Sequence, residues 1–176
     1  MAGCPAAAQA SEQPQAEQPV FASMEFRVGD SQSKTVSHAR ILVIAPSGQV
    51  LASGFTDAHG RWRASLQAPQ DPRFARVKRL GMVTVLAFAK GYNEAVVWEA
   101  PVEPGAVQPV ILEPVRPGQR NEPLVERGNL HRHTLMALIA AYAERQGLVR
   151  QAPVPGEGRY APWGPENSRD SSHRGR

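Results

Sequence analysis

Short hydrophobic runs alternate with turn residues between residues 24 and 114, at intervals of roughly 8–12 residues. This spacing is typical of a β-sandwich or barrel, whereas strands alternating with helices would indicate a parallel α/β sheet. Seven runs predict strands, over residues 25–28, 40–45, 50–56, 61–66, 82–89, 95–100 and 107–112. The predicted fold class is therefore mainly β, with a seven-stranded antiparallel sandwich.

Beyond these strands the hydrophobic period changes to that of a helix. Asn129 fits an N-cap and Gly147 fits a C-terminal stop, so the pattern predicts an amphipathic helix over residues 129–147. We expect this helix to dock on one face of the sandwich, with a partner protein or a membrane surface as the alternative. Its apolar stripe follows the spacing i, i+3, i+4 and i+7 and consists of Leu135, Leu138, Ile139 and Tyr142.

Composition divides the chain into a folded middle and two poorly folding ends. The 176 residues, with 16 Pro and 15 Gly, fit one modest domain. At the two ends few large apolar residues offset the entropy of ordering. We therefore predict a disordered tether (1–22), a β-domain (23–115), a linker (116–128), the helix and a disordered tail (148–176).

The charge distribution points to an anionic ligand more than to nucleic acid. The net charge is +4, but the 20 basic residues are interleaved with 16 acidic ones, so no specific nucleic-acid partner is expected. The long loop before the strand at 82–89 is the best local candidate for binding lipid headgroups or wall polymers. It carries four cations, Arg73, Arg76, Lys78 and Arg79.

Signals for catalysis or a bound metal are weak. His131 and His133 lie two residues apart, so on a helix they point away from each other, and the single Cys excludes an internal disulfide framework. No sequence elbow for a nucleophilic Ser is present, and no apolar run reaches the roughly 20 residues that span a bilayer. We therefore predict no enzyme activity, cofactor or metal.

Three tryptophans suggest an alternative function. Indole rings stack on sugars, so a carbohydrate-binding β-sandwich remains an alternative reading. Trp62 and Trp98 are nevertheless expected in or at the edge of the core, and Trp163 in the tail.

One part of the β-region resembles a known family. The matching features are an apolar strand at 39–44, Gly48, the hairpin Thr56-Asp57-x-x-Gly60-x-Trp62, and the strand end that finishes with Gly91-Tyr92. Together they resemble a carboxypeptidase regulatory-like domain, a small transthyretin-like or prealbumin-like β-sandwich. The resemblance implies a non-catalytic binding or scaffold module, or the accessory or regulatory subunit of a separate peptidase or other envelope enzyme. Here the loop over residues 67–80 is longer and more basic than in that family.

The first four residues carry a second resemblance. Met1-Ala2-Gly3-Cys4 is similar to the end of a bacterial lipobox, in which the Cys receives a lipid. This resemblance implies an extracytoplasmic protein, lipid-anchored through Cys4 to the cell membrane, that binds an unidentified protein or an envelope polymer. The alternative is an ordinary thiol in a cytoplasmic protein.

Overall fold

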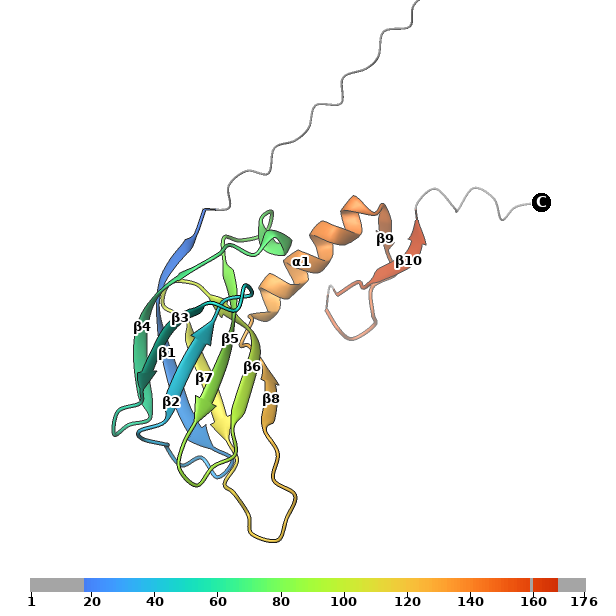
Figure 1. Ribbon diagram of the computed structural model, residues 1–176. Helices are drawn as coiled ribbons and strands as arrows, with labels where there is room; N and C mark the ends of the chain where they lie inside the picture. The colour runs from blue at the N-terminus through green and yellow to red at the C-terminus, as the bar shows by residue number, and fades with distance from the viewer. Residues whose placement is uncertain (1–17, 159, 168–176) are drawn as a thin grey trace, which may run out of the picture.

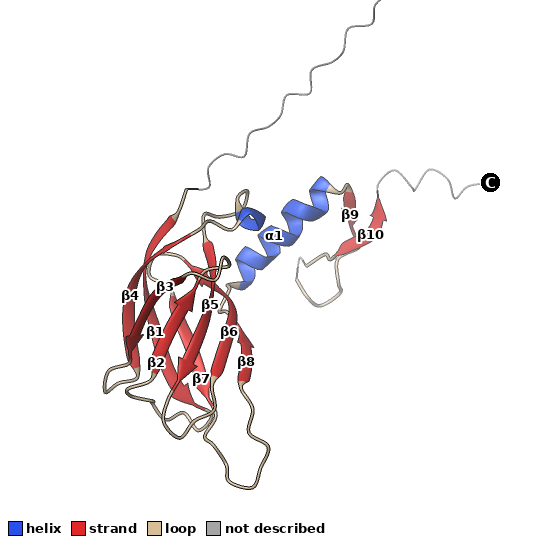
Figure 2. Cartoon of the chain, in the orientation of Figure 1, coloured by secondary structure: helices blue, strands red, loops and turns tan. Residues whose placement is uncertain are grey.

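The computed structural model describes residues 18–158 and 160–167, which form a mainly β structure with one α-helix (Figure 2). The predicted fold class is confirmed at this level, although these residues form ten strands where seven were predicted. In chain order the elements are β1 (Val20–Asp30), β2 (Arg40–Ile44), β3 (Val50–Phe55), β4 (Arg61–Ala68), the 3₁₀-helix η1 (Pro72–Phe74), β5 (Gly81–Phe88), β6 (Ala95–Val102), β7 (Val107–Leu112), β8 (Leu124–Arg127), α1 (Arg132–Arg145), β9 (Leu148–Arg150) and β10 (Trp163–Asn167).

Eight of the strands form two facing sheets (Figure 1). The larger sheet has the order β3-β2-β5-β6-β8, and the smaller has the order β4-β1-β7. Most neighbours are antiparallel, but β1 pairs with β7 and β6 with β8 in parallel, so the prediction of a wholly antiparallel arrangement was wrong. The remaining strands, β9 and β10, form a separate hairpin after the helix.

The core lies between the inner faces of the two sheets. On β1, the alternation turns Met24, Phe26 and Val28 inward, and all three are almost completely buried. They belong to one cluster with Ile41 and Val43 of β2 and with residues of β4 to β7. Burial of this single shared cluster holds the two sheets together.

Several strands extend beyond their predicted limits. β7 matches its prediction, but β1 begins at Val20 because Val20 and Ala22 continue the buried alternation opposite β4. β6 continues through Pro101, which pairs with Met82, although the sequence suggested that proline ends the strand. The structure also places β8 inside the predicted linker, and β9 and β10 inside the predicted tail.

The helix contacts the sandwich through only part of its apolar stripe. It begins after His131, which makes no side-chain cap, so Asn129 was wrong as the predicted N-cap. The predicted stop is present, since Gly147 has the left-handed φ of 68°. Leu138 packs with Leu130 against a small buried cluster around η1, whereas the rest of the stripe is exposed.

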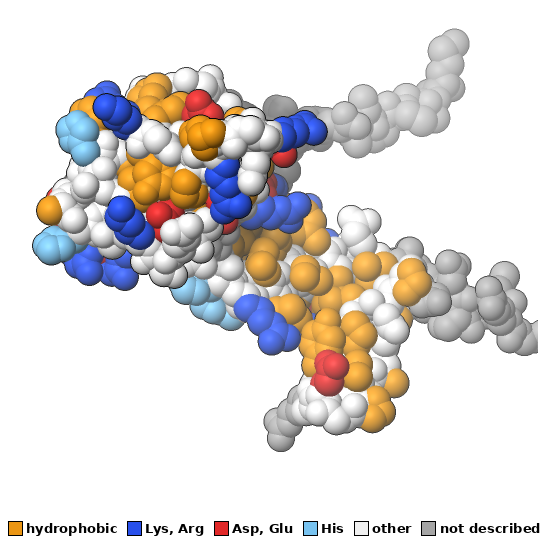
Figure 3. Space-filling view, turned by 90° about the horizontal axis from the view of Figure 1, so that it is seen from below, with side chains coloured by type: hydrophobic (Ala, Val, Ile, Leu, Met, Phe, Trp, Pro, Cys, Tyr) orange, Lys and Arg blue, Asp and Glu red, His pale blue; other side chains and the backbone are white. Residues whose placement is uncertain are grey.

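As a result, α1 and the β9–β10 hairpin project from the sandwich as an arm (Figure 1). Figure 3 shows hydrophobic side chains gathered on this arm. The exposed members of the stripe are Leu135, Ile139 and Tyr142. The expected docking of the whole stripe on a sandwich face is thus not the arrangement found. The first 17 residues and residues 168–176 lie outside the described part of the chain.

Candidate functional site

A bulge in β6 exposes two consecutive side chains on the outer face of the larger sheet. Val83 pairs with Ala100 and Val85 with Val97, so both Trp98 and Glu99 lie where the partner strand supplies one residue. Strand alternation would bury one of the two, yet both are exposed, and Trp98 retains 52% of its accessible surface. Bulges re-aim side chains in this way, and they are common beside functional sites.

The backbone at this bulge is held in an uncommon conformation. Glu99 has a φ of 54°, in the left-handed region, which costs a non-glycine residue about 1–3 kcal/mol. The end of β8 supports it: the Gly128 N–H donates to the Trp98 carbonyl oxygen at 2.6 Å. A Cβ at position 128 would collide with the backbone of Glu99 and Ala100, so only glycine fits there. The bulge is therefore packed in place.

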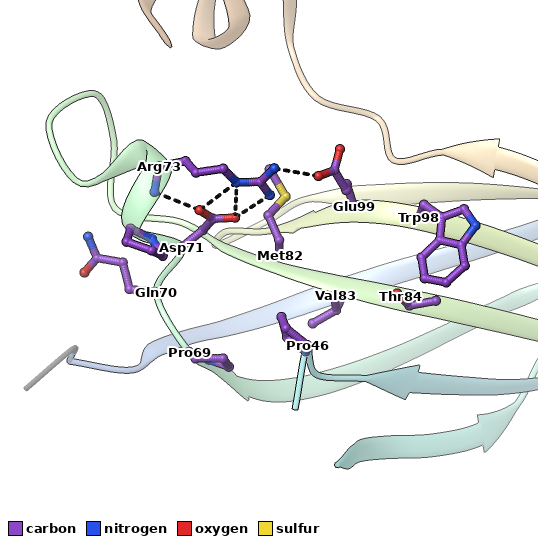
Figure 4. A pocket seen from close by; sticks show the side chains of 11 residues that line it. Pro46, Pro69, Gln70, Asp71, Arg73, Met82, Val83, Thr84, Trp98 and Glu99 are labelled. Carbon is purple, nitrogen blue, oxygen red and sulfur yellow. Dashed lines mark hydrogen bonds and ion pairs between the residues drawn. The ribbon is translucent and has the colours of Figure 1, made fainter. Parts of the chain in front are cut away.

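An ion network fixes the carboxylate of the bulge (Figure 4). The Arg73 guanidinium bridges Asp71 (Nη2–Oδ2 2.6 Å) and Glu99 (Nη1–Oε1 2.7 Å). Asp71 also accepts the Arg73 backbone N–H at 2.9 Å, as the N-cap of η1. Burial opposes the charged form of Asp71, but the hydrogen bonds from Arg73 outweigh it and hold the pKa of that carboxyl below its usual value. The hydrogen bonds to Asp71 and then Glu99 raise the pKa of Arg73 in turn.

An open cavity of about 520 Å³ lies beside this network. Figure 4 shows its lining, in which β5 contributes Met82, Val83 and Thr84 and the bulge contributes Trp98. Pro46 and Pro69 from neighbouring loops and Pro72 of η1 complete the apolar part of the lining. A concave, mainly apolar surface with a few fixed polar groups is the usual form of a ligand site.

A second cavity of about 300 Å³ shares part of the same lining. Arg73, Met82 and Glu99 border both hollows, and Leu130, Leu135 and Leu138 extend the second one toward α1. The Arg73–Glu99 ion pair therefore stands in a wall common to the two cavities. We refer below to the first hollow, with Trp98, as the Trp98 cavity.

The predicted cationic loop does not present four free charges. Arg73 belongs to the network, Lys78 forms an ion pair with Glu103, and the Arg79 guanidinium donates to the Pro19 carbonyl oxygen at 2.8 Å. Arg76 is exposed on the same loop. The loop thus keeps a positive surface, with its first cation built into the edge of the cavity.

The predicted hairpin over residues 56–62 was wrong, because β3 pairs with β2 and β4 with β1, so this turn connects the two sheets. Its residues, which carry the family resemblance, make structural contacts. The buried Thr56 hydroxyl donates to the Val36 carbonyl oxygen at 2.9 Å and accepts the Ala39 N–H at 2.8 Å. Asp57 caps the turn by accepting amide N–H groups, and these hydrogen bonds outweigh burial and lower its pKa. Gly60 has the left-handed φ of 67° that this turn requires.

The remaining signature residues also stabilise the fold. Trp62 packs on the core and stacks on Phe26 with ring centroids 5.3 Å apart. Gly91 has a φ of 85°, and the Tyr92 hydroxyl donates to Asp30 at 3.3 Å. These six predicted residues therefore form turns of the sandwich or pack on its core, and none of them lines the Trp98 cavity.

The three tryptophans do not form a common platform. Trp62, Trp98 and Trp163 lie on β4, β6 and β10, which belong to three different sheets. Trp163 instead packs against the Arg150 guanidinium, 4.1 Å from its ring centroid. Trp98 alone among them borders the cavity of about 520 Å³.

The described residues offer no cluster of three or more His, Cys, Asp and Glu side chains arranged for a metal ion. His131 and His133 stack on each other, with ring centroids 5.5 Å apart. Within the same part of the chain, no helix has the length and apolar character needed to cross a membrane. Cys4, the predicted lipidation site, lies outside the described residues.

Sequence reasoning missed Asp71, Glu99 and the cavity between them. Two signals were present: Asp71-Pro72 is a favourable start for a short helix, and Trp98-Glu99 interrupts the expected alternation of β6. Neither signal says that distant segments meet at one place. That juxtaposition depends on the pairing of β5 with β6 and on the path of the loop between β4 and β5.

Comparisons with known proteins give only distant structural likeness. No family model matches the sequence, and no curated protein matches it. Catechol 1,2-dioxygenase from Acinetobacter radioresistens is similar with a TM-score of 0.39 and 13% identity, over 64% of this chain and 60% of that one. Chlorocatechol 1,2-dioxygenase from Pseudomonas putida is similar with a TM-score of 0.39 and 12% identity, over 55% and 61%. The TIE protein of Bacillus anthracis is similar with a TM-score of 0.39 and 15% identity, over 55% of this chain but 18% of that protein. At these scores the likeness supports no inference about activity.

Proposed function

We propose that this protein is a non-catalytic binding module whose ligand occupies the Trp98 cavity. The observation that carries the proposal is the bulge of β6, which holds an exposed indole at the edge of an apolar hollow. Its Glu99 adopts a costly backbone conformation, which persists only where the surroundings enforce it. Such strain is frequently found at ligand-contacting positions.

The polar groups beside the cavity favour binding over catalysis. Asp71 and Glu99 are both engaged by Arg73, so neither carboxylate is arranged as a free general base. The same network keeps the wall rigid, which lowers the entropy lost when a ligand is bound. The function proposed from the cavity thus agrees with that expected from the resemblance to carboxypeptidase regulatory-like domains.

The proposed setting is the bacterial cell surface, with a transthyretin-like sandwich anchored through lipid on Cys4. Two facing sheets support the first part, and the sequence around Cys4 supports the second. Intact mass of the protein from its native cells tests the anchor. A diacylglycerol-modified Cys4 and recovery with membranes would support it, and an unmodified soluble chain would contradict it.

Binding can be tested with a panel of immobilised probes and a matched pair of variants. The panel contains peptidoglycan, cellulose, chitin, poly-L-proline and anionic phospholipid vesicles. Trp98→Ala removes the indole at the cavity, whereas Phe21→Ala removes an aromatic side chain, 64% exposed, from the other sheet. We expect at least one probe to retain the wild type and Phe21→Ala but to lose Trp98→Ala. Equal retention of all three proteins on every probe would contradict the proposal.

A further inference from the structure

The lining of the Trp98 cavity suits an extended peptide that contains proline. Its apolar surface combines an indole with Pro46, Pro69, Pro72 and Met82. Aromatic-lined grooves bind polyproline II segments by packing on proline rings, and each proline lacks a backbone N–H donor. The charged groups beside the cavity already bond with one another, which leaves Gln70 and Thr84 as the other polar side chains of the lining, whereas a sugar requires more polar partners for its many hydroxyls. A proline-containing peptide is therefore the better match.

The chain itself delivers a segment to the edge of this cavity. The pairing of β1 with β4 ends at Val20 and Ala68, so Pro19 comes directly before this pair and Pro69, which lines the cavity, directly after it. Arg79 of the same loop also donates a hydrogen bond to the Pro19 carbonyl oxygen. Figure 1 shows the start of β1 at the same end of the sandwich as η1. Residues 1–17 therefore join the described chain next to the Trp98 cavity.

The composition of residues 1–17 complements both parts of this surface. The triplet Glu-Gln-Pro occurs at 12–14 and again at 17–19, so a proline of the same local sequence lies five residues before Pro19. Residues 1–17 carry Glu12 and Glu17 and no Lys or Arg. On the loop over 70–80, Arg73 and Lys78 are paired with carboxylates, whereas Arg76 and Arg79 form no ion pair within the described residues. A polyproline II segment rises about 3.1 Å per residue, so even five residues span roughly 15 Å. The charge, composition and length of residues 1–17 are thus all compatible with binding in the Trp98 cavity.

We propose that the Trp98 cavity binds an acidic, proline-containing extended segment, and that its occupant is residues 1–17 of the same chain. This inference rests on the proposed function and names the ligand class of its site. A short connection gives the segment an effective concentration in the millimolar range, so a weak site is occupied within the molecule. An outside peptide of the same chemistry must compete with it, which makes the segment an internal regulator of binding.

Contact fluorescence on the full chain tests the inference, because Cys4 is the one Cys in the sequence. A Cys4→Ser, Gln15→Cys chain carries a bimane label, whose emission is quenched on contact with an indole. We expect the added change Trp98→Phe to restore emission. The matched control Trp163→Phe, on the separate β9–β10 hairpin, should leave emission low. Equal emission with and without Trp98 would overturn the inference.

Two further measurements establish the source of the contact. Glu12→Gln with Glu17→Gln, or added salt, should weaken the quenching, because exposed charge pairs are screened. Tenfold dilution should leave it unchanged, and loss of quenching on dilution would assign the contact to a second copy and overturn the inference.

Titration with octaproline, an outside peptide, separates this inference from the proposed function. An unquenched label together with octaproline binding at Trp98 would overturn the internal occupant and leave the binding module standing. Binding of chitohexaose in place of octaproline would overturn the ligand class. If the label is not quenched and no probe binds at Trp98, both proposals are overturned.

Discussion

Trp62 and Trp98 provide a matched pair, because the same substitution should have opposite consequences at the two positions. Trp62 stacks on the fully buried Phe26 and covers Gly54 so closely that a Cβ there would collide with the indole. Trp98 lies on the outer face of the larger sheet with 52% of its surface accessible. Trp62→Ala should therefore affect folding, and Trp98→Ala should affect binding.

The expected magnitudes follow from burial. Truncating a buried aromatic side chain to Ala costs about 3–5 kcal/mol, and Trp62 is only partly buried, so we expect about 3 kcal/mol. For a domain of this size that corresponds to a fall in Tm of roughly 6–12 °C. An exposed substitution away from such contacts changes stability little, so Trp98→Ala should cost less than about 1 kcal/mol.

Urea unfolding followed by far-UV circular dichroism measures both changes without relying on tryptophan emission. The urea concentration at the unfolding midpoint should fall clearly for Trp62→Ala, while the slope of the unfolding free energy against urea concentration should stay unchanged. In the binding assay, the probe that retains the wild type should also retain Trp62→Ala and Phe21→Ala but should no longer retain Trp98→Ala. A large stability loss for Trp98→Ala, or none for Trp62→Ala, would refute the assignment of one tryptophan to the core and the other to the ligand.

Substitutions at three further positions test the contacts around the site and the fold. Thr56→Val removes two buried hydrogen bonds and should cost about 2 kcal/mol in urea unfolding, whereas Thr56→Ser should keep them and most of the stability. Gly128→Ala pushes a Cβ into the Glu99 backbone and should cost about 1–3 kcal/mol and weaken ligand binding; normal binding would show that β8 does not hold the bulge. Hydrogen bonding, above all from the Lys34 amide, holds the pKa of Asp30 below its usual 3.8, so stability should stay level above about pH 5 and fall as pH drops below about 4. Thermal unfolding across this range should show a shallower acid limb for Asp30→Asn, and an identical limb would contradict the assignment.

The strands of the sandwich were predictable because a strand with one buried and one exposed face alternates apolar and polar residues in the sequence. Residues 107–112 match β7, and the tight turn between β3 and β4 follows from the chemistry of Asp57 and Gly60. These two strands nevertheless lie in different sheets and form no hairpin, which no local pattern indicated. β8 was missed because its four residues, including Glu126 and Arg127, form an edge strand with little apolar surface. Its order depends on parallel pairing with β6, which no local pattern specifies.

The candidate site was predictable only in fragments. Arg73 was singled out for its charge, but its ion pairs with Asp71 and Glu99 neutralise much of that charge, and the one with Glu99 joins residues 26 apart in sequence. Trp98 was expected in the core or at its edge, yet it is exposed, because of a bulge set by the register of β5 against β6. The residue types indicated which interactions were possible, while the pairing of distant strands determined which side chains lie together at the site.

The most direct test of the account is a nuclear magnetic resonance titration of the full chain with octaproline, followed at the tryptophan indole N–H signals. The signal of Trp98 should shift and saturate, and the signals of Trp62 and Trp163 should stay in place. The Trp98→Phe variant, which identifies the signal, should no longer bind the peptide. Saturable shifts at Trp62 or Trp163 with Trp98 unmoved, or binding that survives Trp98→Phe, would contradict the claim that the bulge of β6 forms the ligand site.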